Sequence, residues 1–381
     1  MHWDAYLHAW VVTRYADVLA VLQHFSAART PTPEQLTAMG LAQLVPLAQV
    51  MVRQMLFLDP PAHGRIRGLA SRAFTPRRVA ALRGHIQEIV DSLLEAMLLQ
   101  ESMEIMAHLA NPLPAIVTAE ILGLPASDHQ QLKAWSADFA EVLGNFQHNP
   151  DRAARVLRSL EEMCAYFDSA IHEHRQRPRD DVITGLLTAD LDGDRLTDEE
   201  VVSNLIVTMV GGLETTTNLI GNGLLTLLRH QDQFTQLREE PSLVPSAIEE
   251  MLRYESPSQH TARLAHMDVD MGGKSIAKGQ AVMAVMAAAN RDPERFPDPD
   301  RFDIRRPDNR HVAFAWAHHF CFGAPLARLE GQIVFEALLQ RMPNLRLDSS
   351  TLTWRQNLGL RGLSTLPVTL SSDVSAATPS S

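Results

Sequence analysis

The sequence predicts a mainly α-helical fold with a small antiparallel β subdomain. Most of the 381 residues lie in segments with helical periodicity, and extended apolar runs are few and short. At 45% hydrophobic and 21% charged residues, the composition is that of a globular protein with a substantial core. Because no linker or internal repeat divides the chain, we expect one domain over residues 1–370 and a disordered tail over residues 371–381.

Helix and strand signals can be placed along the chain. Apolar residues at helical spacing predict a helix over residues 76–99. Thr197, with Glu200 three residues later, forms a capping box that opens a long helix over residues 198–229. Shorter helices over residues 245–254 and 324–341 end before prolines. We expect strands over residues 10–13, 281–285 and 366–370.

Charge and cysteine usage exclude several classes of protein. With 34 Lys+Arg against 45 Asp+Glu, the net charge is −11, so no nucleic-acid partner is expected. Cys164 and Cys321 are expected as reduced thiols in a cytoplasmic protein, with one disulfide as the alternative. No signal peptide is apparent. The apolar stretch 201–228 contains Glu214 and several amides and hydroxyls, so we expect a core helix rather than a membrane span.

The segment around Cys321 carries the chemistry. Cys321 directly precedes the 324–341 helix, whose dipole and first-turn N–H groups stabilise a thiolate. Such a thiolate serves as a nucleophile, a zinc ligand or a haem ligand. A nucleophile would have only the awkwardly placed His319 as a base, and structural zinc would lack further ligands. An axial haem thiolate fits its surroundings best. Nucleotide-binding glycine motifs are absent, so electrons for a redox reaction must come from a separate protein.

The order of residues in this segment resembles the haem-binding loop of the cytochrome P450 superfamily, and in detail its soluble bacterial members. Four further motifs of that family occur in the family's order, so the resemblance covers nearly the whole chain. The loop is carried by Phe314, His319, Cys321, Gly323 and Ala327, and the other motifs lie at residues 59–67, 211–216, 250–253 and 289–304.

This resemblance implies a cytochrome P450 fold with haem b between two core helices and Cys321 as the proximal ligand of the iron. A thiolate in that position donates electron density and favours O–O cleavage. Phe314, Gly323 and Gly211 would contact the cofactor. The cations expected to bind the haem propionates are His63, Arg67, Arg263 and His319.

Two further groups are assigned by the same resemblance. Glu214 and Thr215 form an acid–alcohol pair expected to deliver protons at the oxygen site; for Thr215, a hydrogen bond to the preceding helical turn is the alternative. Glu250, Arg253 and Arg306 would form a buried ionic triad that supports the cysteine loop.

The chain also departs from the family pattern. Ala315 and Ala317 stand where glycines are common, and an alanine at positive φ costs about 1–2 kcal/mol. Gly211 replaces a usual alanine and opens space over the haem. The family's first helix would precede a segment like residues 2–12, and we expect it to be missing from this sequence.

An apolar substrate pocket is expected on the distal side. The segment 29–58 is placed like a mobile lid; its Met39, Leu44 and Met51 could line the pocket or pack as plain core. Detailed similarity to bacterial members that tailor macrolides or oxidise carrier-protein-bound acyl chains favours a polyketide, fatty-acyl or terpenoid substrate. The residues expected to line the pocket are Met55, Leu56, Met209, Val210, Ser258 and Leu360.

The predicted activity is therefore that of a monooxygenase that inserts one atom of O₂, with a ferredoxin and a ferredoxin reductase as electron donors. A peroxide-driven haem-thiolate enzyme and a non-catalytic haem sensor are the alternatives. The protein is expected to be a monomer. A basic patch for the ferredoxin would comprise Arg65, Arg72, Arg77, Arg78 and Arg328, unless these arginines are simply scattered on the surface.

Overall fold

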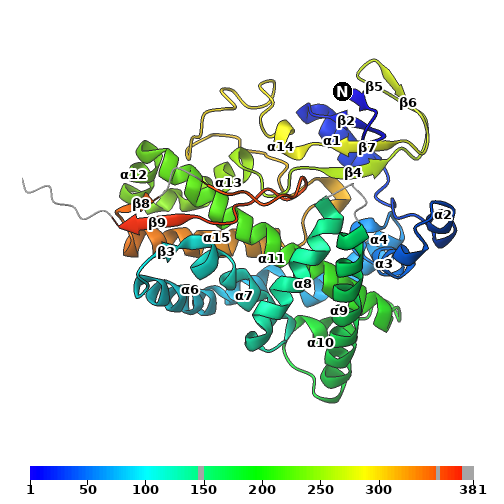
Figure 1. The fold of residues 1–381 in the computed structure, drawn as a ribbon, viewed down its shortest axis with the longest axis horizontal. Helices are drawn as coiled ribbons and strands as arrows, with labels where there is room; N and C mark the ends of the chain where they lie inside the picture. The colour runs from blue at the N-terminus through cyan, green and yellow to red at the C-terminus, as the bar shows by residue number, and fades with distance from the viewer. Residues whose placement is uncertain (145–149, 349–351, 371–381) are drawn as a thin grey trace, which may run out of the picture.

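Helices make up most of the molecule in the computed structural model, and the strands gather near two of its edges (Figure 1). This arrangement confirms the predicted mainly α class. The structure describes residues 1–144, 150–348 and 352–370, so the expected tail over residues 371–381 lies outside them. The helices are α1 Tyr15–His24, α2 Pro33–Ala38, α3 Val45–Met51, α4 Ala62–Ala73, α5 Pro76–Ala81, α6 Arg83–Leu98, α7 Pro112–Leu122, α8 His129–Gly144, α9 Pro150–Gln176, α10 Val182–Thr188, α11 Asp198–Arg229, α12 Gln231–Glu239, α13 Val244–Tyr254, α14 Met286–Ala289 and α15 Ala324–Arg341.

The strands form three small sheets within the described residues. The largest has the order β1-β2-β7-β4, and its β2–β7 pair is parallel, with Trp10 opposite Val282; the other pairs are antiparallel. The predicted strands agree with the observed ones to within one residue at each end. The strands are β1 His2–Asp4, β2 Ala9–Val12, β3 Met103–Glu104, β4 Thr261–Leu264, β5 Val269–Met271, β6 Lys274–Ile276, β7 Ala281–Ala284, β8 Leu345–Leu347 and β9 Pro367–Leu370.

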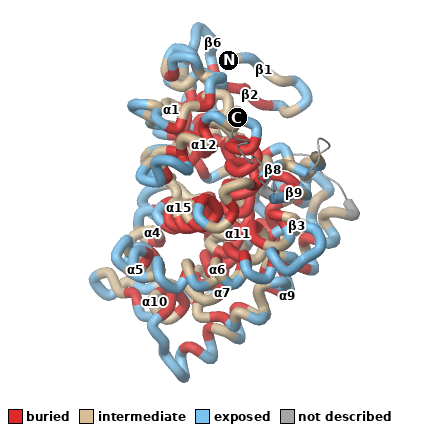
Figure 2. The backbone as a smooth tube through the Cα atoms, turned by 90° about the vertical axis from the view of Figure 1, so that its left-hand side faces the viewer, coloured by how far each residue is buried: buried red, intermediate tan, exposed pale blue. Residues whose placement is uncertain are grey.

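Helix α11 runs through the middle of the molecule and is buried along most of its 32 residues (Figure 2). Its predicted start is confirmed: Thr197 Oγ1 accepts a hydrogen bond from Glu200 N (3.3 Å), and Thr197 N donates to Glu200 Oε2 (2.9 Å). Each bond satisfies a donor that the first helical turn leaves unpaired. No helix in the described part of the chain is long and apolar enough to cross a membrane.

The helix predicted over residues 76–99 is divided into α5 and α6. Leu82 lies at the break, where its N–H bonds to Val79 O three residues back rather than four. Gly84 follows directly, and glycine lowers helix propensity by about 1 kcal/mol relative to alanine. The apolar periodicity continues across the break, which explains why the sequence pattern predicted a single helix.

Helix α15 packs closely on α11 and α13 and thereby positions the loop that precedes it. A side chain at Gly331 would bring its Cβ to 3.1 Å from Ile248 Cδ1 and 3.4 Å from Leu219 Cδ2, so the glycine permits this approach. The packing of α15 therefore fixes the end of the loop that carries Cys321.

Candidate active site

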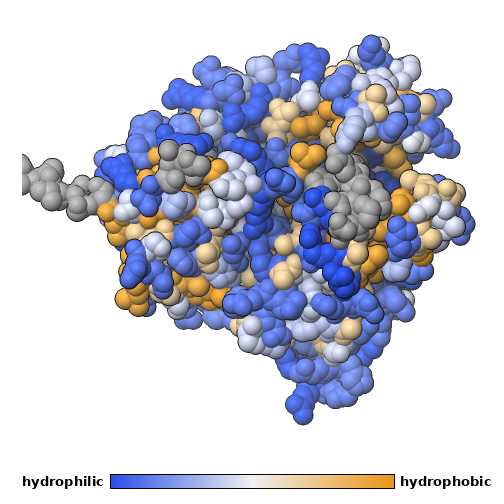
Figure 3. Space-filling view, viewed as in Figure 1, coloured by the Kyte–Doolittle hydropathy of each residue, from blue (hydrophilic) through white to orange (hydrophobic). Residues whose placement is uncertain are grey.

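A cavity of about 580 Å³ lies between α11 and the loop that precedes α15. Its remaining walls come from α4, the segment 29–57, strand β4 and the turn 359–360. The lining is mostly apolar, whereas the outer face seen in Figure 3 is mostly hydrophilic. Among the described residues that line the cavity, none is an aspartate or a glutamate.

Cys321 lies on one wall of this cavity, at the start of α15. Its N–H donates to Phe314 O (2.8 Å), which closes the loop. Burial raises the pKa of the Cys321 thiol, while the N–H groups of Gly323 and Ala324 and the charge of Arg67 act in the opposite direction. These groups favour the thiolate that metal coordination requires. Cys321 and Cys164 are both free, so the disulfide alternative does not hold.

The two alanines that replace glycines in the loop adopt left-handed backbone conformations. Ala315 has φ 59° and Ala317 has φ 56°. The turns still form, since Ala315 N donates to Val312 O (2.9 Å) and Phe320 N donates to Ala317 O (3.1 Å). The loop therefore keeps its shape at a strain cost of about 1–2 kcal/mol for each alanine.

Basic side chains gather at one end of the cavity, where burial lowers the pKa of the two histidines His63 and His319 and leaves the arginines as the cations. The structure brings His63, Arg67, Arg263 and His319 together there, with the rings of the two histidines 4.3 Å apart. Two buried donors of this group, His63 Nε2 and Arg263 Nε, have no hydrogen-bond partner within the described chain. The sequence analysis missed a fifth member, Arg29, because an isolated arginine in a loop carries no motif.

These features fit the expected haem. An axial thiolate, an apolar slot and a cluster of cations with unsatisfied donors match an iron porphyrin that carries two carboxylates. The cations lie at one end of the cavity, as binding of both propionates requires, and Cys321 lies on a wall.

The wall opposite Cys321 is a strip of small residues on α11. Thr215 lines the cavity and donates from Oγ1 to Gly211 O (2.6 Å), the hydrogen bond named above as the alternative to a catalytic role. A Cβ at Gly211 would meet nothing within 4 Å, so this glycine leaves open space. A Cβ at Gly212 would instead lie 2.8 Å from Thr118 Oγ1.

Glu214 does not line the cavity with Thr215. Successive residues of a helix are rotated by about 100°, and Glu214 faces away from the cavity into a cluster of opposite charge. Lys133 Nζ of α8 lies 2.7 Å from Glu214 Oε1, and Arg355 Nη1 lies 2.6 Å from Oε2. The two cations are 81 and 141 residues away in the chain, so no local pattern could have identified them.

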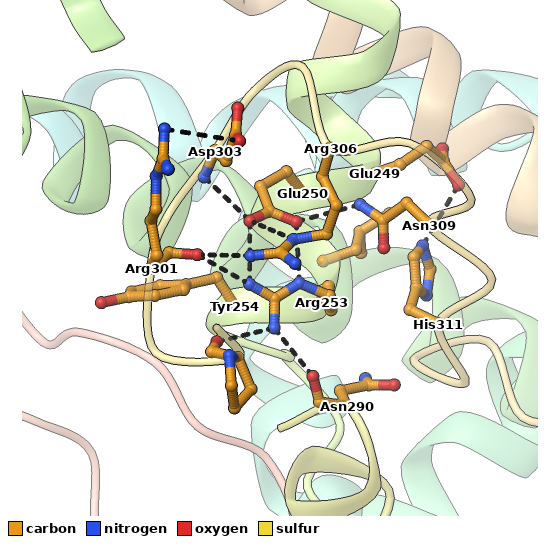
Figure 4. Close-up of polar contacts among 12 residues, drawn as sticks. Glu249, Glu250, Arg253, Tyr254, Asn290, Arg301, Asp303, Arg306, Asn309 and His311 are labelled. Carbon is orange, nitrogen blue, oxygen red and sulfur yellow. Dashed lines mark hydrogen bonds and ion pairs between the residues drawn. The ribbon is translucent and has the colours of Figure 1, made fainter. Parts of the chain in front are cut away.

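The three residues of the expected ionic triad come together in the structure. Both carboxylate oxygens of Glu250 accept hydrogen bonds from Arg253 (2.7 and 2.8 Å), and Arg306 Nε donates to Oε1 (3.2 Å; Figure 4). Asn309 Nδ2 (3.0 Å) and Asp303 N (2.9 Å) complete the shell around the carboxylate. Every oxygen lone pair that a buried carboxylate must satisfy has a donor nearby.

The arginines expected to form a basic patch are mostly paired. Arg65 is ion-paired with Asp194 and Glu200, Arg78 with Asp180, and Arg328 with Glu249. The Arg328 guanidinium also lies 4.6 Å from the centre of the Phe314 ring and so supports the cysteine loop. Of the five, only Arg72 and Arg77 are exposed without an ion pair among the described residues, so the patch is weaker than predicted.

The expected substrate residues divide into two groups. Met51, Met55, Leu56, Ser258 and Leu360 line the cavity. Met209 and Val210 do not line it, so their placement in the pocket is wrong, whereas for Met39 and Leu44 the pocket was one of two alternatives. Helix α11 turns Val207, Thr208 and Gly211 toward the cavity and the intervening residues into the core, because one face repeats every three to four positions. The expected residues that do not line the cavity are Met39, Leu44, Met209 and Val210.

Comparison with known proteins gives a consistent result. The model of the family described as cytochrome P450 matches residues 8–345. The biotin biosynthesis cytochrome P450 of Bacillus subtilis is 41% identical over 361 residues, covering 94% of this chain and 90% of that protein. The cytochrome P450 monooxygenase PikC of Streptomyces venezuelae is 45% identical over 320 residues, or 82% and 75% of the two chains.

A solved structure extends the comparison to three dimensions. The crystal structure of P450BioI in complex with hexadec-9Z-enoic acid ligated acyl carrier protein matches with a TM-score of 0.89 and 41% identity. The match covers 95% of this chain and 92% of that one. The similarity in sequence therefore extends over the whole arrangement of elements that encloses the cavity.

Proposed function

Because the chain belongs to the cytochrome P450 family and is a haem-thiolate monooxygenase, we propose that it hydroxylates an apolar or amphipathic molecule with one oxygen atom of O₂. The observation that carries this proposal is the cavity itself, with Cys321 on one wall, Thr215 on α11 and apolar side chains between them. A fatty-acyl chain, a polyketide or macrolide, or a terpenoid suits such a lining.

Each part of the cavity has its own task in this proposal. Haem b, when bound, supplies the iron at which O₂ is activated. Cys321 Sγ holds the iron from the side of α15, and the Gly323 and Ala324 N–H groups stabilise the negative charge on the sulfur. His63, Arg67, Arg263 and His319 hold the propionates. Met55 and Leu56 exclude water and orient the substrate.

Protons reach the oxygen site through Thr215 and Glu214. Thr215 Oγ1 donates its proton to Gly211 O, so its lone pairs face the cavity and can accept a hydrogen bond from a proton donor there. Glu214 lies next along α11 and, clamped by Lys133 and Arg355, serves as the carboxylate from which water carries protons inward. This relay requires the Glu214 side chain to leave at least one of its two cations.

The electrons are supplied by a ferredoxin and its reductase, and the protein works in the cytoplasm as a monomer. The exposed Arg72 and Arg77 offer part of the positive surface that an acidic ferredoxin would contact. The relatives favour substrates of two kinds. P450BioI is described with a fatty acid ligated to acyl carrier protein, and a further relative, 38% identical, is the polyketide biosynthesis cytochrome P450 PksS of Bacillus subtilis. A carrier-bound acyl chain or a polyketide is therefore the substrate we propose.

Substrate binding can be screened without knowing the reaction product. Candidate molecules are titrated into ferric protein, and the Soret shift on displacement of the iron-bound water is recorded. We expect shifts with hexadecenoyl acyl carrier protein or with macrolactones. Shifts only with small polar molecules would contradict the proposed substrate class.

Thr215→Ala tests the mechanism in a ferredoxin-driven assay with such a molecule. We expect product to fall by roughly tenfold or more, while electron consumption continues and hydrogen peroxide is released. Thr217→Ala is the matched control, because Thr217 is buried on α11 but does not line the cavity. Unchanged product in Thr215→Ala would contradict proton delivery at this residue. If hydrogen peroxide alone sustains turnover of the wild-type protein as well as the ferredoxin system does, the peroxide-driven alternative is favoured. If neither donor gives turnover, the haem sensor is favoured.

A further inference from the structure

Arg29 is a charged side chain in the cavity wall that the proposed mechanism does not use. Its Nη1 donates to Ala27 O (3.1 Å), and its guanidinium lies 4.6 Å from the centre of the Phe57 ring. No ion pair joins it to a carboxylate among the described residues. Burial, followed by the charge of Arg263, lowers the pKa of Arg29 to about 9. Arg29 is half-buried in the chain alone, and a cation in a mostly apolar cavity wall without a counterion indicates an anionic ligand.

Arg29 lies beside the side chains expected to bind the haem propionates, here called the propionate cluster: His63, Arg67, Arg263 and His319. Ser26 N donates to Leu264 O and Leu264 N to Ser26 O, both at 2.9 Å, so the segment before Arg29 is paired with the strand that carries Arg263. Asp59 fixes the same segment by accepting hydrogen bonds from Ser26 Oγ and Ala27 N (2.8 Å). The backbone thus holds the two arginines as neighbours before any ligand binds.

The charges at this end of the cavity give a simple count. Arg29, Arg67 and Arg263 contribute three positive charges, and none of them forms an ion pair within the described chain. Asp59, which interacts electrostatically with Arg263, contributes one negative charge. The difference, 3 − 1, leaves two positive charges in a protein whose net charge is −11. Two carboxylates are what haem b brings.

We propose that Arg29 binds a haem propionate as the third guanidinium beside Arg67 and Arg263. With all three arginines neutralised by the propionates and Asp59, the rest of the cavity has no fixed charge, so the cavity selects an uncharged substrate. This inference depends on the proposed function in one respect only, namely that the protein binds haem. It deepens the substrate class: an acyl group bound as a thioester, or a neutral polyketide, is accepted, whereas a free carboxylate or an amine finds no partner.

The remaining lining supports this selection. The described residues that line the cavity include no carboxylate to receive an amine. Apart from Cys321 and the basic side chains at the propionate end, His260 is the only titratable side chain among the described residues that line the cavity. Burial lowers the pKa of His260, so its imidazole is uncharged at neutral pH. A buried unpaired charge on the substrate would therefore be disfavoured.

The test compares Arg29→Met with Arg14→Met, whose arginine forms an exposed ion pair with Glu294 in the same N-terminal region. Haem transfer from each ferric holoprotein to excess apomyoglobin is timed. Because the variant loses a charge-assisted hydrogen bond to the propionate, we expect Arg29→Met to lose haem roughly tenfold faster than wild type, which corresponds to about 1.4 kcal/mol. Arg14→Met should match wild type. Arg29→Lys should fall between, and it serves as the test variant if Arg29→Met does not accumulate.

A second measurement identifies the ligand of Arg29. Hexadecanoic acid and its methyl ester are titrated into the same proteins, and the Soret shift is recorded. We expect the ester to bind more tightly than the acid in wild type, with the ratio of affinities unchanged in Arg29→Met. Wild-type haem retention in Arg29→Met, together with selective loss of acid binding, would assign Arg29 to a substrate carboxylate and overturn the proposal. Wild-type protein that never binds haem would instead refute the proposed function itself.

Discussion

Glu214 of α11 and Glu250 of α13 are both buried glutamates, and their partners differ in how far they are exposed to solvent. The triad around Glu250 is enclosed: the side chains of Glu250 and Arg253 are 0% exposed and that of Arg306 is 8% exposed. Glu214 is held by Lys133 and Arg355, whose side chains are 17% and 27% exposed and come from two separate elements.

The difference decides what each network can do. Arg253 and Arg306 are enclosed, so we expect the triad to hold the segment 290–309 around it in one shape. Lys133 and Arg355 reach solvent, so either can leave Glu214 and remain hydrated. We therefore expect a rigid side around Glu250 and a movable side around Glu214, where the carboxylate can change partners.

Breaking the rigid side should have the largest effect. Glu250→Ala leaves two buried guanidiniums without a counterion, and we expect the free energy of unfolding to fall by about 3–5 kcal/mol, with no haem-loaded protein recovered. Urea unfolding and haem content measure this. The control is Glu255→Ala, which removes a half-exposed ion pair with Arg361 one turn away and should cost no more than about 1 kcal/mol. A well-folded, haem-replete Glu250→Ala would contradict the role of the triad.

Glu330 sharpens the comparison, because this carboxyl of α15 is buried on the rigid side and its Oε2 has no partner among the described residues. Burial raises the pKa of Glu330 to about 8. The folded state therefore binds this proton more tightly than the unfolded state does. The contribution of the bound proton to the free energy of unfolding is fully present below the unfolded pKa of Glu330 and is lost as pH rises through 8. Glu330→Gln should match wild type near pH 4.5 and exceed it by about 2–4 kcal/mol at pH 8 in urea unfolding. If Glu330→Gln and wild type had equal free energies of unfolding at pH 4.5 and also at pH 8, the carboxyl would be paired or hydrated.

Breaking the movable side should cost less stability than breaking the triad. Glu214→Gln removes the charge but keeps the shape, and because Lys133 and Arg355 can turn to water, we expect a loss of about 1–2 kcal/mol. Haem binding should be retained, while product formation falls and its solvent deuterium isotope effect rises, since proton delivery becomes slower. A loss of stability equal to that of Glu250→Ala would contradict the distinction between the two sides.

The smallest effect concerns the backbone of the cysteine loop. Ala317→Gly removes the strain of a positive φ, and we expect the free energy of unfolding to rise by about 1 kcal/mol with an unchanged Soret band. Ala313→Gly in the same loop segment has no positive φ to relieve and serves as the control. A destabilised Ala317→Gly would mean that the flexibility gained by the unfolded chain outweighs the relief of strain.

The sequence predicted what depends on local patterns and missed what depends on folding. The capping box placed the start of α11 correctly, and the order of motifs identified the cysteine loop and the triad residues. Lys133 and Arg355 were missed because they contact Glu214 across long stretches of chain. Arg29 was missed because an isolated arginine in a loop belongs to no motif. Met209 and Val210 were placed in the pocket because a helical segment was assigned without its rotation, which only the packed structure fixes.

The bond between Cys321 and the haem iron is the claim on which the rest depends, and one spectrum tests it. Full-length protein is expressed with haem available, purified, reduced and exposed to carbon monoxide. We predict the strongly red-shifted Soret band of a thiolate-ligated iron, and its loss in Cys321→His. A band typical of imidazole ligation in the wild-type protein, or protein without tetrapyrrole, would contradict the account.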